Sequence, residues 1–199
     1  MICAVLAGGD SRTFGRDKLT YKVYGKPLIM YCIERVERSK EINKIVIVTR
    51  EEREDEFKRL GYDVIVDNLL VGPIGGIYVT LLEFSEAFFV GGDMPLIVPE
   101  FVDFIVKMFR RSRGDLVVPL WPNGFLEPLH AVYSRGVINT LKESIQSRNY
   151  RVQDAIRRSR ACFIKVEDLP RKWHESFFNV NTVEDVAEFV KRLKMRAYS

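Results

Sequence analysis

Histidine and cysteine are scarce in this chain of 199 residues, which contains two histidines and three cysteines. Cys3, Cys32 and Cys162 lie far apart, so their spacing indicates neither a zinc site nor a disulfide framework. We expect each of them to be a small residue of the core. His130 and His174 belong to no matched Ser or Cys motif, and the sequence therefore gives no sign of a nucleophilic triad.

Long apolar runs are also missing. No stretch approaches the roughly 20 apolar residues that a membrane-spanning helix requires, and no basic region precedes the brief apolar run at the N-terminus, as it would in a secretory signal. The formal net charge is only +4, which is too weak to indicate nucleic-acid binding but suits an acidic small-molecule substrate. We expect a cytoplasmic protein with no membrane or nucleic-acid partner.

What the chain does contain is enough apolar material for one sizeable core, because 47% of its residues are hydrophobic. Its length predicts a single α/β domain over residues 1–199. Apolar runs predict strands at 1–5, 44–49, 63–66 and 87–90, and amphipathic patterns predict helices at 28–38, 51–60 and 77–84, with a loop at 67–76. This alternation predicts a doubly wound, mostly parallel sheet flanked by helices, a Rossmann-like arrangement.

The second half of the chain continues with a helix at 99–111, whose buried face we expect to hold Phe101, Phe104, Ile105 and Met108. A strand at 115–120 and an extended run through residue 133 predict a small antiparallel extension. Helices at 136–147 and 150–160, a strand at 161–166 and a final helix to about residue 194 follow. Thr182 and Asp185 have the spacing of a capping box for that final helix. The tract Arg148, Arg151, Arg157, Arg158 and Arg160 is typical of a solvated helix face, although an anion-binding surface is the alternative.

The most informative stretch is the loop at residues 6–18, which begins directly after the first strand. Gly8 and Gly9 allow the backbone unusual φ/ψ values and a close approach to an anion. Arg12, Arg16 and Lys18 follow within the same loop, and such cations suit phosphate oxygens. The Walker and dinucleotide patterns are excluded, because Gly15 is followed by Arg16 and the first two glycines are adjacent. The loop therefore predicts a site for a nucleoside triphosphate.

Five blocks in this order resemble the molybdenum cofactor guanylyltransferases of the MobA family, within the wider group of nucleotidyltransferases. They are Leu6-Ala7-Gly8-Gly9 with the following residues to Lys18, Asp67-Asn68 with Gly72-Pro73-Ile74-Gly75-Gly76, Gly92-Asp93-Met94-Pro95, Glu127 to Tyr133, and Asn179 to Asp185. One position departs from the signature, since Thr13 stands where the family has Arg and Arg12 lies one place earlier.

The resemblance implies a fold, an activity and a set of site residues. It implies nucleotide binding by Leu6, Ala7, Gly8, Gly9, Lys18, Asp67 and Asp93, catalytic roles for Lys18, Asp93 and Arg12, Mg²⁺ at Asp93, and acceptor binding by Asn179 and Asn181. The substrates would be GTP and molybdopterin or its molybdenum form, with transient contacts to other proteins of cofactor biosynthesis. Ala7-Gly8-Gly9 is similar to the guanylyltransferase form of the loop, whereas related cytidylyltransferases have Ala-Ala-Gly, which favours GTP over CTP.

Simpler interpretations of the same residues remain open. Asp67 and Asp93 are also typical turn formers before Gly or Pro, Lys18 could be a surface charge, and Asn179 and Asn181 could merely flank a helix cap. An extended segment would place both asparagines on the same side. The acceptor could be another phosphorylated compound, such as a cobinamide phosphate or a sugar phosphate. A GTP-binding accessory protein without turnover is the alternative of another class.

Overall fold

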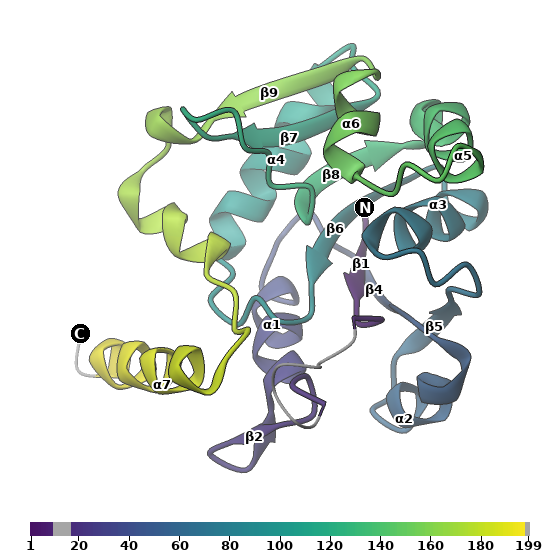
Figure 1. Cartoon of the computed structure of the whole chain (residues 1–199). Coiled ribbons are helices and arrows are strands. Elements are labelled where there is room, and N and C mark those ends of the chain that lie inside the picture. Colours follow the sequence, from purple (N-terminus) through teal and green to yellow (C-terminus); the bar gives the residue numbers. More distant parts are fainter. Residues whose placement is uncertain (10–16, 198–199) are drawn as a thin grey trace.

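A seven-stranded sheet forms the centre of the protein, whose computed structural model describes residues 1–9 and 17–197 (Figure 1). Its strands, in the order in which they lie side by side, are β5 (Asp63–Val66), β4 (Lys44–Thr49), β1 (Ile2–Leu6), β6 (Glu86–Gly91), β8 (His130–Ser134), β7 (Leu116–Leu120) and β9 (Ala161–Lys165). Neighbouring strands are parallel except at β8, which runs antiparallel to both β6 and β7. The predicted mostly parallel, doubly wound sheet with an antiparallel extension is confirmed.

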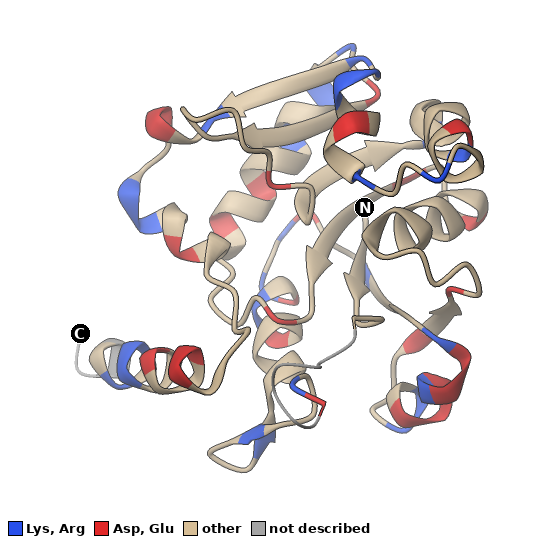
Figure 2. Ribbon diagram, viewed as in Figure 1, with Lys and Arg blue, Asp and Glu red and all other residues tan. Residues whose placement is uncertain are grey.

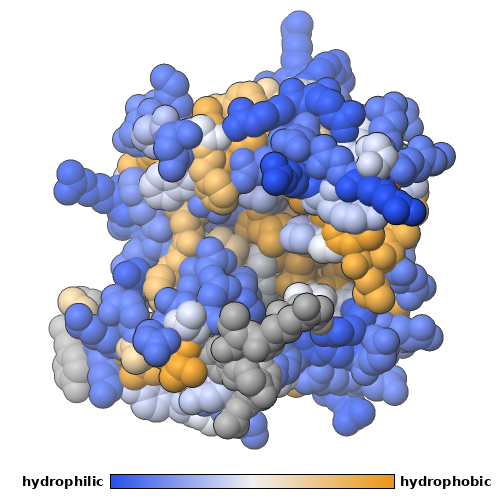
Figure 3. Space-filling model, viewed as in Figure 1, coloured by the Kyte–Doolittle hydropathy of each residue, from blue (hydrophilic) through white to orange (hydrophobic). Residues whose placement is uncertain are grey.

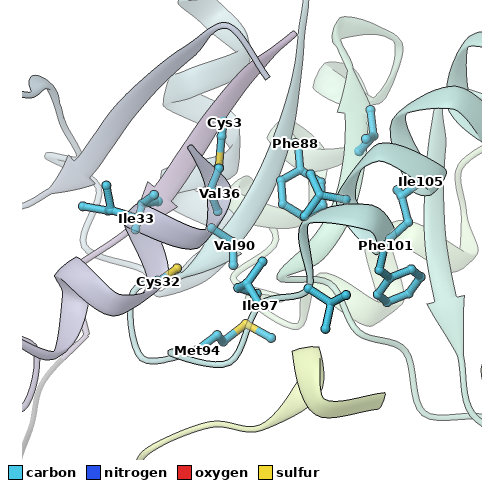
Figure 4. Close-up of a cluster of buried hydrophobic side chains, with 14 of the residues drawn as sticks. Cys3, Cys32, Ile33, Val36, Phe88, Val90, Met94, Ile97, Phe101 and Ile105 are labelled. Atoms are coloured by element: carbon cyan, nitrogen blue, oxygen red, sulfur yellow. The ribbon is translucent and has the colours of Figure 1, made fainter. Parts of the chain in front are cut away.

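Helices cover both faces of this sheet because strand residues alternate between two apolar clusters. Cys3 and Val5 of β1 pack in one cluster, while Ala4 between them packs in the other. The first cluster is covered by α1 (Leu28–Val36), α2 (Glu54–Lys58) and α4 (Pro99–Arg111), and the second by α3 (Pro73–Glu83), α5 (Ile138–Gln146) and α6 (Val152–Arg157). Figure 4 shows the first cluster, in which Cys32 and Ile33 of α1 lie on one side of Val90, and Phe101 and Ile105 of α4 lie on the other.

The strand order places a crevice at a defined edge of the sheet. From β1 the chain adds β4 and β5 on one side and then crosses to place β6 on the other side of β1. In doubly wound sheets, ligands bind outside the carboxyl ends of the strands where the direction of winding reverses. That point lies between the ends of β1 and β6, which are followed by Gly8-Gly9 and by Asp93.

The C-terminal helix α7 (Val183–Ala197) packs outside the sheet, against α1 and a short hairpin. The hairpin pairs β2 (Lys22–Val23) with β3 (Lys26–Pro27), and its turn residues Tyr24 and Gly25 have φ of 48° and 79°. Val23, Leu28, Val180 and Phe189 share a third apolar cluster there. The predicted capping box is present, since Asp185 N donates to Thr182 Oγ1 at 3.2 Å and Asp185 Oδ2 accepts from Thr182 N at 2.9 Å. These contacts close the N-terminal end of α7.

Several expected boundaries and faces are wrong. Helix α3 begins at Pro73 rather than at residue 77, because Pro73 occupies its first position and Gly75-Gly76 belong to the helix instead of to a loop. The helix expected at 51–60 is a 3₁₀ helix, η2 (Glu51–Arg53), followed by the short α2. On α4, Val102 and Val106 are buried with Phe101 and Ile105, whereas Phe104 and Met108 are only partly covered.

The remaining short helices of the part of the chain that the structure describes are η3 (Arg135–Val137), η4 (Val166–Asp168) and η5 (Arg171–Phe177). His130 is fully buried beside Phe101, with ring centroids 4.7 Å apart, and burial lowers its pKa to about 3. His174 lies on η5, where a ring nitrogen is 3.0 Å from the Val166 carbonyl oxygen. Cys3 and Cys32 are core residues, as expected, while Cys162 is half-buried. These side chains thus serve the packing of the fold.

The arginine tract is largely engaged by neighbouring segments. Arg157 Nη2 donates to the Gly124 carbonyl at 2.5 Å, Arg158 bonds Ser144, and Arg160 makes a two-point contact with Asp115 at 2.7 and 2.9 Å. In the view of Figure 2, the acidic segments of α7 come before its basic segments. No helix within residues 1–9 and 17–197 is both long and apolar enough to cross a membrane.

Candidate nucleotide-binding site

A cavity of about 430 Å³ opens at the carboxyl ends of β1, β4 and β6. Its described lining residues come from five parts of the chain: Leu6, Gly8, Gly9, Lys18, Leu19, Val48, Arg50, Asp67, Leu70, Gly72, Pro73, Gly76, Gly91, Asp93 and Leu129. Figure 3 shows that the middle of this face is hollowed and that apolar side chains lie in the depression. Apolar walls with a few charged groups are the usual composition of a small-molecule site. The cavity therefore coincides with the crevice that the strand order defines.

Lys18 is the centre of the polar part of this cavity. Its Nζ atom lies 2.6 Å from Asp93 Oδ2 and 2.8 Å from Asn181 Oδ1, so residues from three distant parts of the sequence meet at one ammonium group. The exposed fractions of the Lys18 and Asp93 side chains are only 16% and 23%. A charge-assisted contact that is partly shielded from water holds both side chains in one geometry.

Gly91 and Gly75 have no side chain, and the carboxylates of Asp93 and Asp67 occupy the space beside them. A Cβ atom on Gly91 would lie 2.6 Å from Asp93 Oδ1, and one on Gly75 would lie 2.8 Å from Asp67 Oδ2. Neither glycine has a positive φ, so the requirement at both positions is space for the neighbouring carboxylate. The backbone of Asp93 is also fixed, since its carbonyl accepts from Val180 N at 2.9 Å and ties the end of β6 to the segment before α7.

Asp67 lies on the opposite side of the cavity, directly after β5. Its Oδ1 atom accepts from Leu69 N at 2.9 Å, which is the turn-forming contact expected of an Asp before a Gly/Pro loop. Burial nevertheless raises the pKa of Asp67, and the backbone donors at Leu69 and Leu70 offset only part of that effect. Asp67 is thus both a turn residue and a half-buried carboxylate in the cavity wall.

Gly8 and Gly9 both line the cavity. Neither has a positive φ, and among the described residues a Cβ atom on either would meet nothing within 4 Å. Within the described chain, the missing Cβ atoms therefore leave the space beside this backbone open to a ligand. Ala7 is fully buried and is not among the described lining residues; its carbonyl accepts from Thr49 Oγ1 at 3.3 Å.

The two asparagines, which the sequence places on one side of an extended segment, make different contacts. Asn181 Oδ1 accepts from Lys18, whereas Asn179 Nδ2 donates to the Phe177 carbonyl at 3.0 Å. Phe177 packs edge-on against Trp121, whose indole N–H donates to Glu127 Oε1 at 2.7 Å. Glu127 is half-buried, and burial raises its pKa. Asn181 is therefore part of the polar centre at Lys18, whereas Asn179 contacts the end of η5.

Some predicted site residues lie outside the described residues, and two residues that line the cavity were not predicted from the sequence. Arg12, together with Thr13 and Arg16, falls in the range 10–16, which the structure does not describe. Arg50 lines the cavity but was not predicted, although it follows β4 as directly as Asp67 follows β5. The strand-end rule that singled out Asp67 could have found it. Leu129 also lines the cavity and reaches it from the far side of β6, a placement that no local pattern indicates.

The sheet is doubly wound and has its cavity at the winding reversal, and the cavity is lined by glycines, by Lys18 and Arg50, and by Asp67 and Asp93. These features are those of a nucleotide-binding α/β protein. Comparison with known proteins defines it further. The sequence matches the MobA-like NTP transferase domain over residues 3–162. A probable molybdenum cofactor guanylyltransferase of Thermococcus kodakarensis is 53% identical over 186 residues, which cover 94% of this chain and 92% of the relative.

A second relative with the same description, from Pyrococcus furiosus, is 49% identical and is covered over 98% of both chains. The crystal structure of molybdopterin-guanine dinucleotide biosynthesis protein A from Archaeoglobus fulgidus superimposes with a TM-score of 0.82 at 29% identity, covering 94% of this chain and 96% of that one. The chain belongs to the MobA-like nucleotidyltransferases, in the group of the molybdenum cofactor guanylyltransferases.

Proposed function

We propose that this guanylyltransferase transfers GMP from GTP to molybdopterin or its molybdenum form and releases pyrophosphate, with the reaction taking place at Lys18. The observation that carries the proposal is the convergence of Lys18, Asp93 and Asn181 at the edge of a cavity walled by Gly8 and Gly9. Membership of the family supports the reaction type. The site residues follow from the contacts in this chain.

The chemistry requires no nucleophile from the protein. An oxygen of the acceptor's terminal phosphate attacks the α-phosphorus of GTP, a new P–O bond forms, the bond from that phosphorus to the bridging oxygen breaks, and pyrophosphate leaves. The protein's task is to align the two substrates and to stabilise the negative charge that develops. Lys18 and Arg50 are the cations among the described cavity residues, and they would lie against the phosphates of GTP.

The residues present fit a magnesium ion. Asp93 Oδ2 and Asn181 Oδ1 are both hard oxygen donors, and they already share one cation, the ammonium of Lys18. Within the described chain no three His, Cys, Asp or Glu side chains are grouped to hold a metal, which suits Mg²⁺, since it is commonly held by one or two carboxylates together with substrate phosphates and water. When bound, Mg²⁺ would neutralise phosphate charge, with Asp93 as its carboxylate and Asn181 beside it.

A single assay tests the substrates. Purified protein is incubated with magnesium, molybdopterin and either GTP or CTP, pyrophosphate release is followed, and the product is analysed by mass. We expect release with GTP, a product heavier by one GMP, and a clear preference for GTP over CTP. A preference for CTP would overturn the base assignment. Turnover only with a cobinamide phosphate or a sugar phosphate would overturn the acceptor. GTP binding without pyrophosphate release would indicate an accessory protein.

We expect Asn181 both to bind the acceptor and to hold the Lys18 ammonium in place. The change Asn181→Ala removes the amide oxygen that holds the ammonium at 2.8 Å, so we expect a higher KM for molybdopterin, roughly a tenfold fall in kcat, and nearly unchanged GTP affinity. Asn179→Ala, which loses only the contact to the Phe177 carbonyl, should raise the acceptor KM without lowering kcat. Steady-state kinetics with both substrates varied would measure this split.

The exposed Asn43, which precedes β4 at the opposite end of the sheet from the cavity, provides a matched control, and Asn43→Ala should behave like the parent protein. If the Asn181 or the Asn179 variant lost GTP affinity while its acceptor KM stayed the same, that asparagine would belong to the nucleotide half of the site.

A further inference from the structure

Arg53 makes a set of contacts that ordinary surface arginines do not make. It is the last residue of η2, and its side chain is only 12% exposed. Each of its three guanidinium nitrogens contacts a different residue: Nε donates to Glu56 Oε2 at 2.9 Å, Nη1 donates to the Ala7 carbonyl at 3.1 Å, and Nη2 lies in an ion pair with Asp17. The guanidinium also lies 4.6 Å from the ring centre of the buried Phe57. The group is therefore fixed in both position and plane.

Two of these contacts reach the segment that carries the polar centre of the cavity. Ala7 is the last residue before Gly8-Gly9, and Asp17 is the residue before Lys18. Asp17 is held on its other side as well, because its Oδ1 atom accepts from Leu19 N at 3.0 Å. A single side chain on η2 therefore joins the exit of β1 to the residues on either side of Lys18.

Arg53 does not touch the reaction space itself. Arg50, three residues earlier, lines the cavity, whereas Arg53 is not among the described residues that do so. Of the residues that it contacts, Ala7 and Asp17 are likewise not among the described lining residues. Between β4 and α2, Arg50 thus lines the cavity, whereas Arg53 contacts the Ala7 carbonyl and the Asp17 side chain.

We propose that Arg53 is a positioning residue, which fixes Asp17 and the end of β1 so that the Lys18 ammonium is held at Asp93 before substrate binds. This inference rests on the proposed function, because it assigns the reaction to Lys18. Positioning of this kind affects the rate strongly, since a displacement of about 1 Å at a reacting group can cost on the order of a hundredfold in rate. Ground-state affinity for GTP, to which many groups contribute, depends on it much less.

The variants Arg53→Met, Arg53→Lys and Asp17→Asn test the role, with Arg59→Met as the matched control, because Arg59 is an exposed arginine at the end of α2. We expect Arg53→Met to lower kcat about tenfold to a hundredfold with little change in the KM for GTP, at a temperature where every variant is folded. Arg53→Lys should recover part of the rate because it keeps the charge. Arg53→Met combined with Asp17→Asn should cost no more than Arg53→Met alone.

Amide hydrogen exchange gives a second measurement that needs no turnover. In Arg53→Met the amide of Leu19 should exchange faster, because the carboxylate that accepts from it is no longer anchored, while β4 stays protected. Equal kcat in Arg53→Met and Arg59→Met, or unchanged exchange at Leu19, would overturn the inference. If the parent protein transferred no nucleotide, the proposed function would fail separately, and the exchange experiment would still decide whether Arg53 positions the segment.

Discussion

Replacing Asp93 by asparagine is expected to lower kcat at least about a hundredfold while leaving the fold intact. Asparagine keeps the shape of the side chain, so the space that Gly91 leaves for it remains filled. The backbone contact from Val180 to the Asp93 carbonyl is also unaffected. What is lost is the negative charge that Lys18 faces at 2.6 Å and that we propose for holding magnesium.

The measurement is the steady-state rate as a function of magnesium concentration. The Asp93→Asn protein should need much more magnesium for half of its own maximal rate, and removal of magnesium by a chelator should stop the parent protein. Asp63→Asn is a suitable control, because Asp63 is exposed at the opposite end of β5 and pairs only with the exposed Lys44 at 2.8 Å among the described contacts. Near-normal turnover in a folded Asp93→Asn protein would rule out Asp93 as the metal ligand.

The site residues that directly follow strands could be predicted because the sequence pattern that marks them is local. An apolar run followed at once by Gly8-Gly9, Asp67 or Asp93 indicates a strand that ends at a polar loop. The alternation of strands and helices then requires these ends to meet at one edge of a parallel sheet. The cavity contains all three positions. The same reasoning applied to Arg50 would have added it to the candidates.

Long-range contacts were beyond such reasoning. Lys18 and Asn181 are separated by 163 positions, and no periodicity or spacing relates them. Only the resemblance to a family placed both at the site, without indicating that they touch. The contact depends on how α7 packs against α1 and the β2–β3 hairpin through Val180 and Phe189, which is a property of the folded molecule.

The glycines explain why the start of α3 was misplaced. Gly75 and Gly76 follow a proline and lower helix propensity, so the sequence indicated a loop. In the structure, other atoms fill the space that a Cβ atom would need at these two positions. Asp67 Oδ2 would lie 2.8 Å from a Cβ on Gly75, and Leu6 Cδ2 would lie 2.9 Å from one on Gly76. Tertiary packing at the cavity therefore overrides local propensity over these two residues.

Replacing Lys18 by alanine is expected to reduce kcat by roughly two to three orders of magnitude, with a much smaller change in the KM for GTP. The ammonium group lies where Asp93 and Asn181 converge, at 2.6 and 2.8 Å. Charge on the departing pyrophosphate grows as the bond to the α-phosphorus breaks, so a cation at this point stabilises the transition state more than bound GTP.

Single-turnover and steady-state rates at saturating GTP would measure the loss, with Lys22→Ala as the control, because Lys22 is an exposed lysine of the nearby β2 strand. Thermal unfolding would show whether Asp93, deprived of its partner, has destabilised the protein. Lys18→Arg should restore only part of the rate, since a guanidinium keeps the charge but cannot occupy the space of an ammonium between two oxygens. An unchanged kcat in Lys18→Ala would mean that Lys18 contributes only to binding or to structure, and the charge stabilisation would then have to come from Arg50.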